Sequence, residues 1–62
     1  MENNIATIRK RKAIMQKDLA KMVGIYPTSM SKVERGKRGA SRQLLERIAK
    51  QLDVSIKDIF LD

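Results

Sequence analysis

The sequence predicts an all-α protein, a compact bundle of five helices in one domain that spans residues 1–62. Apolar residues recur at the three- and four-residue spacing of helices. Gly, Pro and Ser stand where helices would begin and end. Strand signals are weak, because the chain has one Tyr, one Phe and no Trp, and apolar and polar residues do not alternate. So short a chain holds a single small core and has no room for a barrel with a substrate pocket.

The first two helices follow from capping residues and apolar stripes. Asn3 or Asn4 is suited to cap the first helix. The inward side of this helix is expected to hold Ile5, Ile8, Arg9 and Lys12. The second helix begins at Gln16 and ends before Gly24, where a left-handed residue is free of strain. Its apolar stripe consists of Leu19, Ala20 and Val23.

The third helix begins at Pro27, because proline suits the first helical position. Met30 and Val33 form its apolar side, and Gly36 stops it. Residues 24–26 between the second and third helices form a short turn that contains glycine. The two helices, about 16–23 and 27–35, therefore form a helix-turn-helix.

Serine residues begin the last two helices. Ser41 is a suitable cap for the longest helix, whose stripe consists of Leu44, Leu45, Ile48, Ala49 and Leu52. Residues 55–58 resemble a capping box with Asp58 at its third helical position. The residues expected to face inward from this last helix are Ile56, Ile59 and Phe60.

The net charge of +7 is confined to part of the chain. Residues 1–38 carry ten basic and three acidic side chains, whereas residues 39–62 carry four of each. A basic part and a neutral part indicate one face for a polyanion and another for packing or partners. A solvated helix face is the simpler interpretation of the basic run at residues 9–12, taken alone.

Composition also excludes several classes of protein. The chain has no Cys and no His, so disulfides, zinc–thiolate sites and the usual general base are excluded. We expect no metal, no cofactor and no enzyme activity. Neither a long apolar run nor a signal peptide is visible, which favours a cytoplasmic protein that does not enter a membrane.

The outward face of the third helix favours nucleic-acid binding. At 100° per residue, Thr28, Ser31, Lys32 and Arg35 point away from the apolar side, and Ser29 lies on the flank. Each of these side chains is a hydrogen-bond donor. Any surface helix has polar residues outside, but here none is acidic and the helix lies in the basic part of the chain.

Beyond this pattern, residues 16–37 resemble the Cro/repressor-type (XRE-like, lambda-repressor-like) helix-turn-helix family. The resemblance rests on Gln16, Leu19-Ala20, Gly24-Ile25, Ser31 to Glu34, and Gly36-Lys37. It extends to Ile8-Arg9 and to Leu44 through Phe60, which is nearly the whole chain. It implies the compact five-helix, lambda-repressor-like fold of a DNA-binding domain.

The resemblance also implies roles for matching residues. Candidate contacts to bases are Thr28 and Lys32, with the position of Pro27 and with Ser29 and Tyr26 as further candidates. Candidate contacts to phosphates are Gln16, Lys17, Ser31, Arg35, Lys37 and Arg38. Arg9 and Glu34 match a pair that forms a structural salt bridge between the first and third helices in this family.

The chain departs from the family pattern at three positions. Pro27 stands where Gln or Arg often recognises a base, so it makes no bidentate contact. Met15 replaces the usual Ser or Thr cap of the second helix, and Ala13 stands where Gly often ends the first. We expect the turn at Ala13 to differ from that of the family.

These features predict a sequence-specific regulator of transcription that binds double-stranded DNA, most simply as a repressor. One helix in the major groove discriminates too few base pairs to select a single site. We therefore expect a homodimer on an inverted repeat, with recognition helices about 34 Å apart. Ile56, Phe60 and Leu61 in the neutral part are candidates for its interface, although Phe60 is expected rather to complete the core.

Other functions remain open at this point. A helix-turn-helix of this family can act through protein contacts, as an antitoxin or a bridging cofactor, and Pro27 favours this alternative. A cationic membrane peptide is disfavoured because Gly24, Pro27 and Gly36 interrupt any long amphipathic helix. RNA binding is disfavoured by the near absence of aromatic side chains for stacking.

Overall fold

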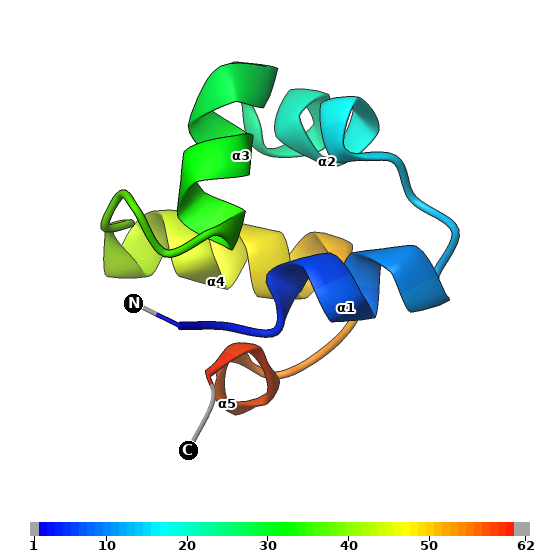
Figure 1. Cartoon of the computed structure of the whole chain (residues 1–62). Coiled ribbons are helices and arrows are strands. Elements are labelled where there is room, and N and C mark those ends of the chain that lie inside the picture. The colour runs from blue at the N-terminus through cyan, green and yellow to red at the C-terminus, as the bar shows by residue number, and fades with distance from the viewer. Residues whose placement is uncertain (1, 61–62) are drawn as a thin grey trace.

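The computed structural model describes residues 2–60 and contains five helices (Figure 1). They are α1 (Ile5–Arg11), α2 (Gln16–Val23), α3 (Pro27–Glu34), α4 (Arg42–Gln51) and α5 (Ile56–Ile59). The predicted five-helix, all-α fold is confirmed. The third helix ends at Glu34, and Arg35 is its C-cap rather than its last residue.

The helices surround one apolar core. In Figure 1, α2 and α3 lie above α4, α1 lies in front of one end of α4, and α5 lies below. Packing between elements is most extensive for α2 with α3, α2 with α4, and α4 with α5. The buried apolar residues are Ile5, Ile8, Leu19, Ala20, Val23, Met30, Val33, Leu45, Ile48, Ala49, Leu52 and Ile59. Every helix contributes to this core, so no helix is an appendage.

Local capping follows the sequence for α4 and α5. The Ser41 hydroxyl accepts a hydrogen bond from the Leu44 N–H at 3.1 Å. The predicted capping box is present, with the Ser55 N–H donating to Asp58 Oδ2 at 3.0 Å. For α1, the N-cap residue Asn4 makes no capping hydrogen bond with its side chain, and Asn3 before it accepts from the Ile5 N–H through Oδ1 at 3.1 Å. The starts of α1, α4 and α5 thus carry the polar caps that the Asn and Ser residues in the sequence predicted.

Two expectations about burial are wrong. Phe60 is 39% exposed, because the chain is extended after α5 and residue 60 pairs with Asn3 in an isolated antiparallel bridge. Lys12 is exposed, because α1 ends at Arg11 and Lys12 is its C-cap. Ile56 is half-buried and packs against the core, as expected. Leu61 lies outside the described residues.

All four longer helices end in the same left-handed turn. The residues with positive φ are Ala13, Gly24, Gly36 and Asp53. After each of them, the next N–H donates to the carbonyl five residues earlier, as in Ile25 to Ala20 at 3.0 Å. This is the Schellman arrangement, which satisfies carbonyls at the helix end. The turn after α1 therefore keeps the left-handed conformation despite Ala13, contrary to expectation.

The residue after each left-handed turn determines whether the following chain packs against the core or stays on the surface. Ile14, Ile25 and Val54 follow three of these turns and pack against the core. Lys37 follows the fourth, at the end of α3, and is exposed. The chain after α3 is consequently not drawn into the core but remains on the surface, and it carries positive charge there.

Ala13 predicts a simple gain in stability. Its φ of 58° is in the left-handed region, where the Cβ of a residue other than glycine destabilises the folded state by about 1–2 kcal/mol. Glycine removes this strain, but its greater conformational entropy in the unfolded chain destabilises the folded state by about 0.4–1 kcal/mol. We expect Ala13→Gly to raise the free energy of unfolding by about 0.5–1 kcal/mol and Tm by several degrees. Thermal melting followed by circular dichroism measures both.

The matched control makes the same chemical change inside α1. Ala6 lies within this helix, so Ala6→Gly is expected to lower the free energy of unfolding by about 0.5–1 kcal/mol. If both variants are destabilised, the strain assigned to Ala13 is absent.

Candidate nucleic-acid interface

The helix-turn-helix is formed by α2, the turn at residues 24–26, and α3. Gly24, at φ 78°, allows the reversal after α2. Pro27 begins α3, and the Met30 N–H donates to the Tyr26 carbonyl at 3.0 Å as the first helical bond. Met30 and Val33 anchor α3 in the core. The opposite side of α3 is therefore turned toward solvent.

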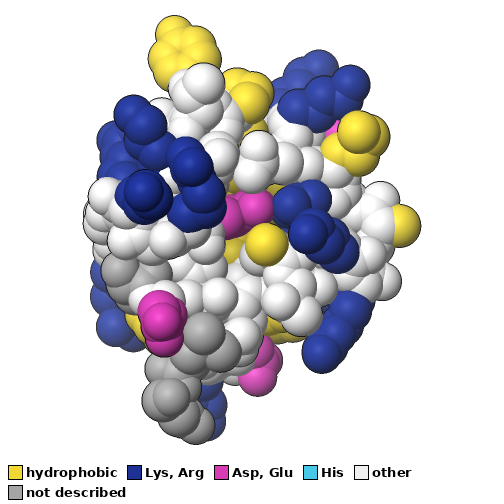
Figure 2. All heavy atoms as spheres, in the orientation of Figure 1, with side chains coloured by type: hydrophobic (Ala, Val, Ile, Leu, Met, Phe, Trp, Pro, Cys, Tyr) yellow, Lys and Arg dark blue, Asp and Glu magenta, His cyan; other side chains and the backbone are white. Residues whose placement is uncertain are grey.

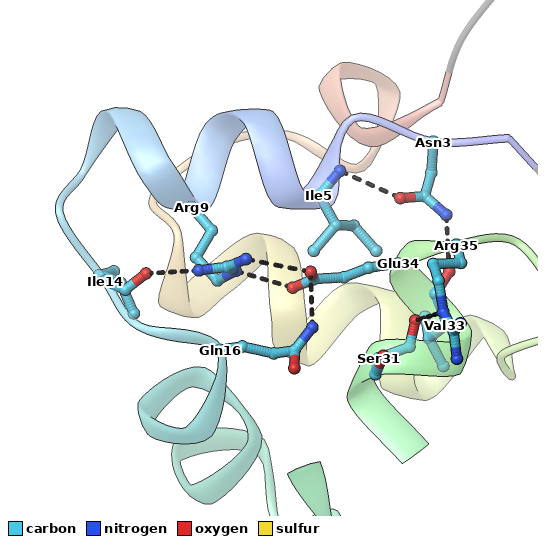
Figure 3. A network of polar contacts seen from close by, with 9 residues as sticks. All are labelled: Asn3, Ile5, Arg9, Ile14, Gln16, Ser31, Val33, Glu34 and Arg35. Atoms are coloured by element: carbon cyan, nitrogen blue, oxygen red, sulfur yellow. Dashed lines mark hydrogen bonds and ion pairs between the residues drawn. The ribbon is translucent and has the colours of Figure 1, made fainter. Parts of the chain in front are cut away.

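A buried ion pair fixes α3 relative to α1 (Figure 3). The Arg9 guanidinium donates twice to the Glu34 carboxylate, from Nε to Oε2 at 2.8 Å and from Nη2 to Oε1 at 3.2 Å. The Arg9 and Glu34 side chains are only 10% and 4% exposed. The salt bridge that the resemblance implied is thus present, with two-point geometry and nearly out of reach of solvent.

Two further donors extend this ion pair into a network. Arg9 Nη1 donates to the Ile14 carbonyl at 2.9 Å, in the link between α1 and α2. The Gln16 side-chain amide donates to Glu34 Oε1 at 3.1 Å, from the first residue of α2. Figure 3 shows these side chains pointing toward one another from three segments of the chain. Glu34 therefore aligns the start of α2 with the end of α3.

Asn3 has a role that the sequence did not predict. Beyond capping α1, its Nδ2 donates to the Val33 carbonyl at 2.9 Å (Figure 3). The chain before α1 is therefore tied to the last turn of α3. An amide beside a helix start indicates a cap, and no local pattern reveals a partner 30 residues away.

The candidate base contacts lie on the outer side of α3. Thr28 and Lys32 are exposed, as predicted for that face. Tyr26 is 79% exposed, and Pro27 beside it is exposed as well. Ser29 is half-buried on the flank, and its hydroxyl accepts a hydrogen bond from Arg38. Four of the five candidates thus form one exposed surface, whereas the hydroxyl of Ser29 is engaged.

The candidate phosphate contacts lie around this surface. Arg38 Nη1 donates to Ser29 Oγ at 2.9 Å, and Arg35 Nε donates to the Ser31 carbonyl at 3.3 Å. Lys37 N–H donates to the Lys32 carbonyl at 2.9 Å, which closes the turn after α3. The guanidinium groups of Arg35 and Arg38 are thus held close to α3 by hydrogen bonds, whereas Lys37 is tied to it through its backbone.

The start of α2 offers further donors. Met15 is its N-cap and supplies no side-chain hydrogen bond, as expected from the sequence. Lys17 in the first turn is exposed, and Gln16 is half-buried. Figure 2 shows Lys and Arg side chains over much of the left and upper-right edges of this face. A surface with these donors and few acids suits a polyanion.

The comparisons with known proteins agree with this geometry. The family model described as "Helix-turn-helix" matches residues 5–59. The chain belongs to the helix-turn-helix family. This helix-turn-helix protein is 36% identical over 61 residues to an uncharacterised HTH-type transcriptional regulator from Methanocaldococcus jannaschii, covering 98% of this chain and 92% of the relative. It is also 36% identical over 56 residues to the antitoxin PezA from Streptococcus pneumoniae, covering 90% of this chain but 35% of the relative.

A solved structure extends the likeness to the fold. The DNA-binding domain of the P22 c2 repressor superimposes with a TM-score of 0.80 at 32% identity, covering 86% of this chain and 70% of that one. The resemblance to Cro/repressor-type (XRE-like) regulators is thereby confirmed, and the fold is lambda-repressor-like. Proteins of this type are DNA-binding regulators of transcription and not enzymes. Within residues 2–60, no helix has the length and apolar character needed to cross a bilayer.

The buried ion pair predicts a large and specific loss of stability. Arg9→Met or Glu34→Gln leaves one buried charge without its partner, which costs about 3–5 kcal/mol. A chain of 62 residues has only about 3–9 kcal/mol of stability in total. Either variant should therefore lose at least about a third of its free energy of unfolding, and urea unfolding at neutral pH should show its midpoint at much lower urea.

An exposed ion pair in the same chain serves as the control. Arg42 Nε lies 2.9 Å from Glu46 Oε1, but these side chains are 79% and 56% exposed. Arg42→Met is expected to cost less than about 0.5 kcal/mol. Equal losses at Arg9 and Arg42 would show that burial does not strengthen the dependence on the pair.

Proposed function

We propose that this helix-turn-helix protein is a sequence-specific regulator that inserts α3 into the major groove of double-stranded DNA. The observation that carries the proposal is the division of α3 into two chemically distinct sides. Met30, Val33 and Glu34 are turned inward, the last against Arg9. Thr28 and Lys32 remain exposed, so the only acid of α3 is removed from the side that meets DNA.

Hydrogen-bond donors and cations on both sides of the outer face of α3 support this placement. At the start of α2, the uncapped N–H groups and the helix dipole favour an anion, with Lys17 nearby. At the end of α3, Arg35, Lys37 and Arg38 supply cations. The Gln16 side chain donates to Glu34, and this hydrogen bond orients its Nε2 group at the start of α2.

We further propose that the regulator binds an inverted repeat as a homodimer and acts in the cytoplasm as a repressor. Each good base contact discriminates by about 1–3 kcal/mol, so one α3 selects too few base pairs. The C-terminal part of the chain has balanced charge, and it exposes Phe60 beside half-buried Ile56. Apolar surface without like-charge repulsion suits contact between two copies.

The likeness to the antitoxin PezA favours a second candidate function, in which contact with a protein partner dominates. The chain spans only about a third of that relative, so the likeness concerns the helix-turn-helix portion. In this second function, contact with the protein partner is the main activity, and DNA binding is either secondary to it or absent. Selection of DNA sequences distinguishes the two functions.

Selection from random DNA tests the proposed function. A pool of random 30-base-pair duplexes at about 150 mM salt suppresses binding through phosphate attraction alone. We expect enrichment of a short inverted repeat whose half-sites are centred about one helical turn, roughly 34 Å, apart. Retention of duplexes without enrichment would contradict sequence-specific regulation and favour a function through protein contacts.

Two substitutions separate base contacts from phosphate contacts on the selected operator. Lys32→Ala should weaken binding and change the preferred base at one position of each half-site. Arg38→Ala should weaken binding to all sequences similarly and reduce the salt slope by about 1 per protomer. Kd measured against salt concentration, for the operator and a scrambled duplex, gives both quantities.

The control removes the same charge elsewhere. Lys50 lies in the last turn of α4 and is exposed, outside the candidate DNA contacts and outside the surface proposed for the dimer, so Lys50→Ala should change neither base preference nor affinity by more than about twofold. Identical behaviour of the Lys32 and Arg38 variants would mean that α3 does not enter the groove.

A further inference from the structure

The first turn of α3 presents carbon atoms at its exposed end. Tyr26, the N-cap, is 79% exposed, and its side chain makes no capping hydrogen bond. Pro27, also exposed, has only ring carbons in its side chain and no N–H. Exposed Thr28 adds a γ-methyl beside its hydroxyl. These three residues, 26–28, are called the α3 tip below.

The side chains that recognise adenine or guanine through two hydrogen bonds are missing at this end of α3. Asn and Gln bind adenine in this way, and Arg binds guanine. The helix from Pro27 to Glu34 contains none of the three. Gln16 donates to Glu34 at 3.1 Å, and Arg38 donates to Ser29 at 2.9 Å, so these neighbours are held by other partners.

Thymine carries the one apolar group among the base edges of the major groove, its 5-methyl. An exposed carbon surface contacts that methyl group favourably and gains nothing from the polar edges of the other bases. We propose that the α3 tip selects thymine through its 5-methyl group, so that each operator half-site carries thymine at one or two fixed positions. The inference rests on the DNA binding proposed above. Lys32, one turn further along, then contacts the acceptors of a neighbouring guanine.

Deoxyuridine tests this contact, because it differs from thymidine only in lacking the methyl group. Each thymine of the selected operator is replaced in turn, and Kd is measured by fluorescence anisotropy. Burial of one methyl-sized group corresponds to a change of about fourfold in Kd. We expect that loss at one or two thymines of each half-site, and about 15-fold when both half-sites are substituted.

Variants of the α3 tip identify the protein side of the contact. Thr28→Ser removes one methyl group and keeps the hydroxyl, and Pro27→Ala removes ring carbons. Each should bring the ratio of Kd for the deoxyuridine and thymidine operators closer to one. Thr28→Val keeps both branches of the side chain and should preserve the ratio. Arg38→Ala is the matched control, because it weakens binding to both operators alike and leaves the ratio unchanged.

The outcomes separate this inference from the function on which it rests. An operator whose thymines all tolerate deoxyuridine overturns recognition of the methyl group and leaves binding through α3 intact. A ratio that neither these variants nor Tyr26→Ala alters overturns the assignment of the contact to residues 26–28. Failure to enrich any operator overturns both proposals. Melting curves for each variant check that the fold is retained.

Discussion

The position of α3 depends on the buried ion pair between Arg9 and Glu34. An eight-residue helix is too short to be stable in water by itself, so its orientation has to come from tertiary contacts. The pair joins α1 to the end of α3, and the bonds to Ile14 and Gln16 add the link before α2 and the start of α2. Because an unpaired buried charge is costly, these segments are held in one arrangement. The same contact removes an acid from the surface that is proposed to meet DNA.

The ends of the helices explain how a small core supports an extended basic surface. Three left-handed turns are followed by an apolar residue that returns to the core, and the turn after α3 is followed by Lys37. Because the residue after this fourth turn is a cation and not an apolar side chain, residues 37–39 stay outside the core. Ser29 holds Arg38 against the flank of α3. This long side chain is therefore already restricted before binding and loses less conformational entropy when it binds. The basic surface is therefore ordered in part before any ligand arrives.

Local chemistry made most of the fold predictable, and tertiary contacts account for what was missed. Ser41 and the apolar stripes predicted the helices and the core, because caps and periodicity act within a few residues. Phe60 was expected in the core, but the extended chain after α5 pairs with Asn3 instead. For the interface, exposure of the outer side of α3 was predictable from its periodicity. The engagement of Ser29 by Arg38 was not, because the two residues meet only through the turn after α3.

Backbone amide shifts in a titration with the selected operator test the central claim, that the clamped α3 is the element that meets DNA. In ¹⁵N-labelled protein, the account predicts the largest changes at residues 26–32, at Gln16 and Lys17, and at Lys37 and Arg38. Residues of α5 should shift only where two protomers meet. Changes confined to α4 and α5, with α3 unaffected, would contradict the account and assign binding to a different face of the molecule.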